Sequence, residues 1–204
     1  MPINPENPIL AAMSRAWDVL IAVLLFLLCA LPLVTFGASM TALYATLMAV
    51  ARDECGSVAK KFFKTFVAEF KIATEVWMIL LAAGLLLAAD IWACWFWQNN
   101  AIPALPFLRS ITVIFGIIWL CVFSYAFSGI ARYVVSLTQV FRNCLTLSVQ
   151  NPGHTVLIAA LYVAVLATIY LAGVLAFPAW FVILYWLAKL YIRVFERAEK
   201  EVGK

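Results

Sequence analysis

Residues 31–39 read Leu31-Pro32-Leu33-Val34-Thr35-Phe36-Gly37-Ala38-Ser39 and interrupt the first long apolar run of the chain, which covers residues 13–51. Proline lacks a backbone donor and clashes with the preceding helical turn, whereas glycine adopts backbone angles that other residues avoid. The stretch therefore predicts a reversal between two helices, at about residues 13–34 and 38–52. A single crossing by residues 13–52 is the alternative, because the second helix is short for a membrane span.

The composition places these helices in a membrane. Of the 204 residues, 67% are hydrophobic and 12% are charged, and the mean hydropathy is +1.04. A soluble domain is roughly 45–50% apolar and about 25% charged. A chain of 22.7 kDa cannot hide so much apolar surface in its own core. A soluble globular fold is therefore excluded.

The remaining apolar runs complete an all-α fold, a membrane helix bundle. About 20 apolar residues are needed to cross a hydrocarbon layer of roughly 30 Å. By this measure, residues 1–204 form one membrane domain with six transmembrane helices, at about residues 13–34, 38–52, 72–97, 106–132, 155–173 and 178–194. Five transmembrane helices result if residues 13–52 cross only once.

The basic residues lie on one side of this predicted bundle. Of the 14 Lys and Arg, 13 lie in four segments: before span one, between spans two and three, between spans four and five, and toward the end of the chain. Arg109 is the exception. Lys and Arg are enriched in cytoplasmic loops. Both termini are therefore predicted to be cytoplasmic, and the formal charge of +4 reflects this orientation and contact with anionic headgroups of the lipid bilayer.

Residues 57–71 are predicted to form a basic amphipathic helix. Its candidate lipid or partner surface consists of Lys60, Lys61, Phe62, Phe63, Lys64, Phe66, Phe70 and Lys71. Such a helix can lie in the headgroup plane, where each basic charge contributes about 1 kcal/mol of binding to anionic lipid. It either anchors the bundle or docks another protein. A second amphipathic segment, residues 132–150, is expected to continue span four beyond the membrane.

Two ionisable residues are predicted to lie at membrane depth on the same side. Asp90 is about two turns before the end of span three, and Arg109 is about one turn into span four. Charges inside a bilayer are costly and mark either packing pairs or transport pathways. We expect a structural ion pair between Asp90 and Arg109, with a substrate or proton site as the alternative. Asp18 and Lys189 form a further conceivable pair.

The interruption at residues 32–37 is a second candidate site. A ligand site there would use Pro32, Thr35, Gly37 and Ser39, with Thr35 or Ser39 capping the following helix so that its amides face an anion or a hydroxylated ligand. Broken helices of this kind occur at transporter binding sites. The alternative is a tight turn followed by close packing through the small residues Ala38, Ala42, Ala45 and Ala49.

Several motifs of enzymes are missing from the sequence. It contains no GxxxxGK(S/T), GxSxG or HExxH pattern, and a single histidine, His154, cannot supply a metal cluster unaided. The five cysteines form no CxxC pair and are interpreted as small hydrophobic residues. We therefore predict no enzymatic activity, no catalytic residues, no metal, no cofactor and no nucleic-acid partner.

Four segments carry a family resemblance: residues 31–39, Thr41-Ala42-Leu43-Tyr44, Lys61-Phe62-Phe63-Lys64-Thr65-Phe66 and Phe70-Lys71-Ile72-Ala73-Thr74. Over about residues 15–75 the chain resembles the YesL family of uncharacterised bacterial membrane proteins. The resemblance implies a multi-pass protein of the bacterial plasma membrane that is accessory to carbohydrate uptake through an ABC importer, with importer subunits as partners. It implies no catalytic residue. The alternative is a small transporter or channel that uses the interruption at residues 32–37 and Asp90.

Overall fold

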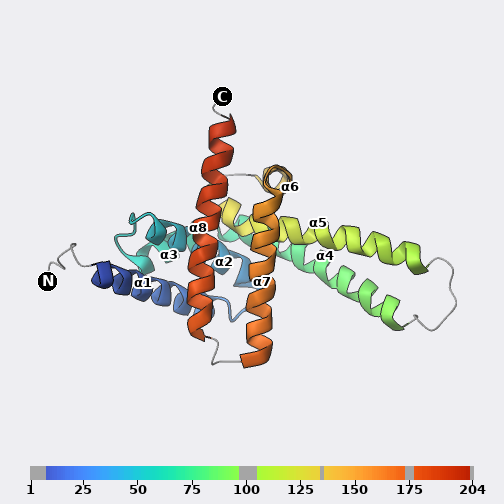
Figure 1. The fold of residues 1–204 in the computed structure, drawn as a ribbon, viewed down its shortest axis with the longest axis horizontal. Coiled ribbons are helices and arrows are strands. Elements are labelled where there is room, and N and C mark those ends of the chain that lie inside the picture. Colours follow the sequence, from blue (N-terminus) through green and yellow to red (C-terminus); the bar gives the residue numbers. More distant parts are fainter. Residues whose placement is uncertain (1–7, 97–104, 134–135, 173–176, 203–204) are drawn as a thin grey trace.

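The computed structural model describes residues 8–96, 105–133, 136–172 and 177–202. Within these ranges all regular structure is helical (Figure 1). The elements in chain order are α1 (Pro8–Cys29), the short 3-10 helix η1 (Leu33–Thr35), α2 (Phe36–Ala51), α3 (Val58–Ala68), α4 (Phe70–Phe96), α5 (Leu105–Arg132), α6 (Leu137–Gln150), α7 (Pro152–Ala172) and α8 (Phe177–Val202).

Helix α2 is the centre of the molecule. It packs against α1, α3, α4, α5 and α8, and every residue from Gly37 to Met48 is buried. The small residues Ala38, Ala42 and Ala45 are among them, and small side chains let neighbouring helices approach closely. The structure therefore agrees with the alternative of close packing through small residues after the turn.

The serine and threonine hydroxyl groups of α2 are satisfied by backbone carbonyl groups one turn earlier. Ser39 Oγ donates to the Thr35 carbonyl at 2.9 Å, Thr41 Oγ1 to the Gly37 carbonyl at 3.0 Å, and Thr46 Oγ1 to the Ala42 carbonyl at 2.7 Å. A buried hydroxyl without a partner costs free energy, so these local bonds allow a helix with polar residues to be buried on all sides.

The chain reverses between α1 and α2, as the proline and glycine predict. Helix α1 ends at Cys29, α2 begins at Phe36, and the two helices pack against each other, so residues 13–52 do not form one continuous helix. The reversal is held against α4, because the indole Nε1 of Trp77 donates to the Leu33 carbonyl at 2.8 Å. A Cβ atom at Gly37 would lie 2.6 Å from the Trp77 Cβ and would also collide with the carbonyl oxygen of Ala73.

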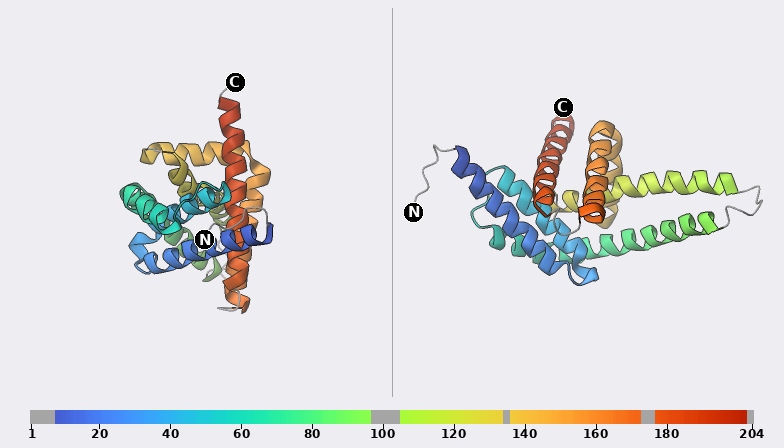
Figure 2. Two further views of the ribbon diagram at one scale, coloured as in Figure 1. Left: turned by 90° about the vertical axis from the view of Figure 1, so that its left-hand side faces the viewer. Right: turned by 60° about the horizontal axis from the view of Figure 1, so that its bottom comes forward.

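Helices α4 and α5 run side by side and extend away from the other helices (Figures 1 and 2). The indole Nε1 of Trp119 donates to the Leu80 carbonyl at 2.9 Å and ties the two helices together. Apolar side chains such as Leu86 (70% exposed) and Val113 (61% exposed) point outward along the pair. Exposed apolar surface of this kind is suited to lipid.

Helices α7 and α8 pack together and run across the direction of α4 and α5 (Figures 1 and 2). The two pairs do not share one direction, and the count of six transmembrane helices stays a prediction. Three helical segments within the described ranges are long and apolar enough to cross a membrane, namely Leu33–Ala51, Phe70–Ala93 and Arg109–Arg132.

Two segments differ from the sequence-based expectation. Residues 132–150 do not continue span four: α5 ends at Arg132, and α6 begins after Ser136, whose backbone N–H donates to Gln139 Oε1 at 2.9 Å. This side-chain bond starts a new helix that folds back onto α5. The helix expected over residues 57–71 ends at Ala68, and Glu69 leaves the helical conformation (φ −100°, ψ 6°) before α4 starts.

The close approach at Gly37 predicts a large effect of a small substitution. We expect Gly37→Ala to lower the free energy of unfolding by about 1–3 kcal/mol, because the added methyl group meets the backbone of α4 and the rigid Cβ of Trp77. The loss is measured as a lower thermal unfolding midpoint in detergent. Gly116→Ala in α5 is the matched control, since a Cβ there meets nothing within 4 Å. An equal midpoint for both variants would show that the contact between α2 and α4 tolerates a side chain.

Candidate functional site

The helix interruption is closed by its own hydrogen bonds. Thr35 occupies the N-cap position of α2 without a capping side-chain bond; its hydroxyl contacts the Cys29 carbonyl at 2.6 Å and the Pro32 carbonyl at 2.8 Å. Ser39 is buried and donates to the Thr35 carbonyl, whereas Pro32 is exposed. Neither hydroxyl is directed at the amides of α2. The tight-turn alternative agrees with this geometry, and ligand binding at these residues stays a prediction.

Helix α3 presents two distinct faces. Val58 and Phe62 are buried in the core beneath it, with Phe62 0% exposed. Phe63 is 47% exposed, Val67 is 73% exposed, and the lysines Lys60, Lys61 and Lys64 are exposed. Phe62 therefore belongs to the attachment of α3 and not to its outer surface, although the four-residue spacing grouped it with the outward rings.

The aromatic residues of this segment continue past α3. The rings of Phe62 and Phe66 are stacked with centroids 6.3 Å apart, and Phe66 meets Phe70 edge to face at 5.6 Å. Phe70 is the first residue of α4 and, like Lys71, is exposed. The ring series thus joins two helices across the turn at Glu69.

The two charged residues predicted at membrane depth lie on the extended helix pair. Asp90 is exposed and borders a groove between α4 and α5, and Arg109 is exposed near the start of α5. Within the part of the chain that the structure describes, ion pairs join Arg15 to Asp53 at 2.8 Å and Arg52 to Glu196 at 3.7 Å. Pairing of Asp90 with Arg109 stays a prediction.

A polar cleft lies where α1 meets the connection between α2 and α3. Arg15 binds Asp53 through two bonds, Nε to Oδ1 at 3.0 Å and Nη2 to Oδ2 at 2.8 Å, and Asp53 has a positive φ of 58°. Asp18 lines the same cleft of about 250 Å³. The ammonium of Lys189 lies over the Tyr185 ring at 4.7 Å, and pairing of Asp18 with Lys189 stays a prediction.

A cluster of tyrosines at the crossing of four helices is absent from the sequence-based candidates. Tyr44 of α2 hydrogen-bonds Tyr162 of α7, which lies 3.3 Å from the Tyr191 hydroxyl of α8, and Tyr191 donates to the Ser124 carbonyl of α5. Tyr44 and Tyr191 are fully buried. These residues are up to 147 positions apart, from Tyr44 to Tyr191, so no local pattern could have revealed the cluster.

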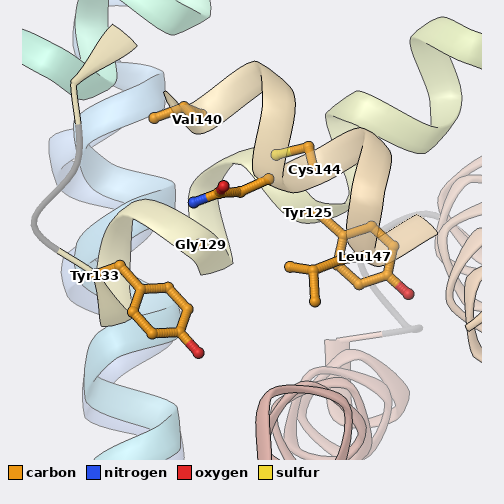
Figure 3. Close-up of a pocket in the computed structure, with 7 residues that line it drawn as sticks. Tyr125, Gly129, Tyr133, Val140, Cys144 and Leu147 are labelled. Carbon is orange, nitrogen blue, oxygen red and sulfur yellow. The ribbon is translucent and has the colours of Figure 1, made fainter. Parts of the chain in front are cut away.

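One small cavity lies next to this cluster. Figure 3 shows a cavity between α5 and α6, bordered by Tyr125, Gly129, Cys144 and Leu147. Its volume of about 10 Å³ is at the lower limit for one water molecule. Tyr125 is engaged, because its hydroxyl lies 3.0 Å from Thr155 Oγ1. This cavity is too small for a substrate.

The interior formed by the described residues is an apolar core that contains a few hydrogen-bonded polar side chains. No group of three or more His, Cys, Asp or Glu side chains in the described ranges is placed to hold a metal ion. The fold and its three membrane-length helices define an all-helical membrane protein.

The family comparison agrees with this class. The model of a family described as a protein of unknown function, DUF624, matches residues 19–91, which run from α1 through the reversal and α3 into α4. The match is consistent with the resemblance to the YesL family, which rests on the same part of the chain. No curated protein and no solved structure matches the chain.

The tyrosine cluster predicts energetic coupling between helices. We expect Tyr44→Phe and Tyr162→Phe each to lower the free energy of unfolding, because each removes the side-chain hydrogen bond between α2 and α7. The double variant should lose less than the sum, with a coupling of about 1 kcal/mol, measured by chemical unfolding in detergent. Additive losses would mean that the two hydroxyls do not stabilise the crossing of α2 and α7.

Burial also predicts the chemical behaviour of Cys144. Desolvation raises the pKa of this thiol to about 12, because the charged thiolate is disfavoured in the apolar contact between α5 and α6. At pH 8 only about one thiol in 10,000 would then be ionised. We expect mass spectrometry to find Cys144 unlabelled by maleimide in the folded protein and labelled after denaturation. Rapid labelling in the folded protein would show that α6 detaches from α5.

Proposed function

We propose that the protein is an accessory subunit of the bacterial plasma membrane, with both termini cytoplasmic, that assists carbohydrate uptake by binding subunits of an ABC importer through α3. The observation that carries the proposal is the division of α3 into a buried face at Val58 and Phe62 and an outer face at Phe63 and Val67, flanked by lysines.

A helix fixed in this way is suited to docking. Its inner face is anchored by side chains that are fully or almost fully buried, so its outer face has a fixed orientation and little conformational entropy is lost on binding. Exposed apolar side chains beside basic charges fit both a headgroup plane and an acidic, apolar groove of another protein. The lysines favour an importer surface that is acidic and close to the membrane.

Two ion pairs hold the segment that precedes α3. The Arg15–Asp53 pair joins α1 to the connection that leads into α3, and the Arg52–Glu196 pair joins the end of α2 to α8. The two pairs involve the consecutive residues Arg52 and Asp53, so the connection that leads into α3 is held both to α1 and to α8. Exposed ion pairs contribute little stability, and we interpret these two as contacts that orient α3 for docking.

The carbohydrate part of the proposal rests on the resemblance to the YesL family. A small transporter or channel is the second candidate, and Asp90 at the border of an apolar groove favours it. The interior favours the accessory role, because the described hydroxyls at the helix crossing bind one another and the reversal is closed by Trp77.

The outer face of α3 gives the test. We expect the double variant Phe63→Ser with Val67→Ser to co-purify with at least tenfold less of the permease subunits of a carbohydrate ABC importer from the same bacterium. The amounts are measured by quantitative mass spectrometry. Folded yield should not change, because both side chains are exposed. Val149→Ser, at a 78% exposed position on α6, is the matched control and should leave co-purification unchanged.

Two results would contradict this role. One is equal co-purification of the importer subunits with the α3 double variant and with wild type. The other is uptake of a sugar by liposomes that contain the purified protein alone, which would favour the transporter. Phe62→Ala is unsuitable as a docking variant, because loss of this buried ring is expected to destabilise the protein by about 3–5 kcal/mol.

A further inference from the structure

An apolar groove opens on the outside of the extended helix pair. Side chains of α4 and α5, including Leu87 and Phe115, form its walls, and Phe141 and Leu145 of α6 also border it. Its volume is about 460 Å³, within the range of roughly 300–1,000 Å³ typical of ligand sites. Asp90 is the one charged residue among those that line it.

The dimensions of the groove match one leaflet of a bilayer. Along α4 it runs from Ile79 to Asp90, which at 1.5 Å per residue is about 16 Å. One leaflet contributes half of a hydrocarbon layer of roughly 30 Å. Trp92 is 71% exposed two residues beyond Asp90, and tryptophan prefers the boundary between hydrocarbon and headgroups. Asp90 therefore lies just inside that boundary, with the groove leading toward the bilayer centre.

We propose that this groove binds one acyl chain of an aminophospholipid, whose primary ammonium group is held by the Asp90 carboxylate. The walls match a hydrocarbon chain, and the charge at the boundary end matches a headgroup cation. A carboxylate beside apolar walls is costly unless a cation with N–H donors binds it. Arg109, the partner that the sequence predicts for Asp90, is not among the residues that line the groove, so in this proposal the lipid ammonium takes the place of that pair. An anionic headgroup is repelled by Asp90, and a trimethylated choline headgroup offers no N–H donor.

The location on α4 separates this site from the basic surface of α3. The lysines of α3 are suited to anionic lipid, whereas the groove has a single negative charge near the opposite end of α4. Asp90 is 20 residues beyond Phe70, which corresponds to about 30 Å of helix. The lipid site does not depend on the role in carbohydrate uptake and can be tested without an importer.

The headgroup part of the proposal is tested by lipid retention. Full-length protein is reconstituted in vesicles with equal amounts of phosphatidylethanolamine, phosphatidylcholine and phosphatidylglycerol of the same acyl chains, transferred to mild detergent and analysed by native mass spectrometry. We expect one retained phosphatidylethanolamine, at least fivefold over either other lipid. Asp90→Asn should abolish this preference, and Glu75→Gln, at an exposed carboxylate of α4 outside the groove, should keep it.

The groove itself is tested by a matched pair of neighbouring alanines. Ala83 lines the groove, whereas Ala82 is exposed and does not line it. Ala83→Phe should prevent retention of any lipid, and Ala82→Phe should retain phosphatidylethanolamine as wild type does. Equal retention of the three lipids by wild type, or an unchanged preference in Asp90→Asn, would overturn the proposal. So would a dimer that Ala83→Phe dissociates, because a second copy would then fill the groove.

Discussion

The burial of α2 on all sides is the constraint on which the rest of the structure depends. Helices α1, α3, α4, α5 and α8 pack against it, so no face of α2 is left for unsatisfied polar groups. Small residues allow the approach, and hydroxyl groups that bond to carbonyls of the same helix remove the cost of polarity. Gly37 is the tightest point, since only a residue without a side chain fits against the α4 backbone.

Two kinds of polar contact then fix the surrounding helices. Indole groups of Trp77 and Trp119 donate to carbonyls at Leu33 and Leu80, and so tie α4 to the reversal and to α5. Tyrosine hydroxyls join α2, α5, α7 and α8 at their crossing. Apolar contact alone orients helices weakly in lipid, because lipid tails are as apolar as leucine, so these directional bonds select one arrangement.

Much of the helical framework could be predicted from local sequence. The apolar runs located the helices, and Pro32 with Gly37 predicted the reversal, because their backbone chemistry acts on neighbouring residues. The turn at Glu69 was missed, since no proline or glycine marks it. The return of α6 onto α5 was also missed, although Ser136 and Gln139 have the spacing of a capping box, which could have revealed the start of a new helix.

The candidate sites also divide into features that local sequence predicts and features that depend on tertiary packing. The exposed lysines of α3 follow from composition, but the burial of Phe62 depends on where α2 and α1 lie, and a four-residue spacing cannot tell the inner face from the outer one. The tyrosine cluster depends on tertiary packing alone. Asp90 was identified because a charge in an apolar run is conspicuous, whereas the groove beside it exists only after α4, α5 and α6 come together.

The two surfaces proposed as binding sites are linked by the length of one helix. Helix α4 begins beside the lysine-bearing α3 and reaches Asp90 after about 30 Å, the thickness of the hydrocarbon layer. The signs of charge at its two ends therefore address two different boundaries, with cations at one and a carboxylate at the other. An electrostatic preference of this kind would favour anionic lipid or an acidic partner at α3 and an ammonium headgroup at Asp90, so one rigid helix would couple two chemically distinct membrane contacts.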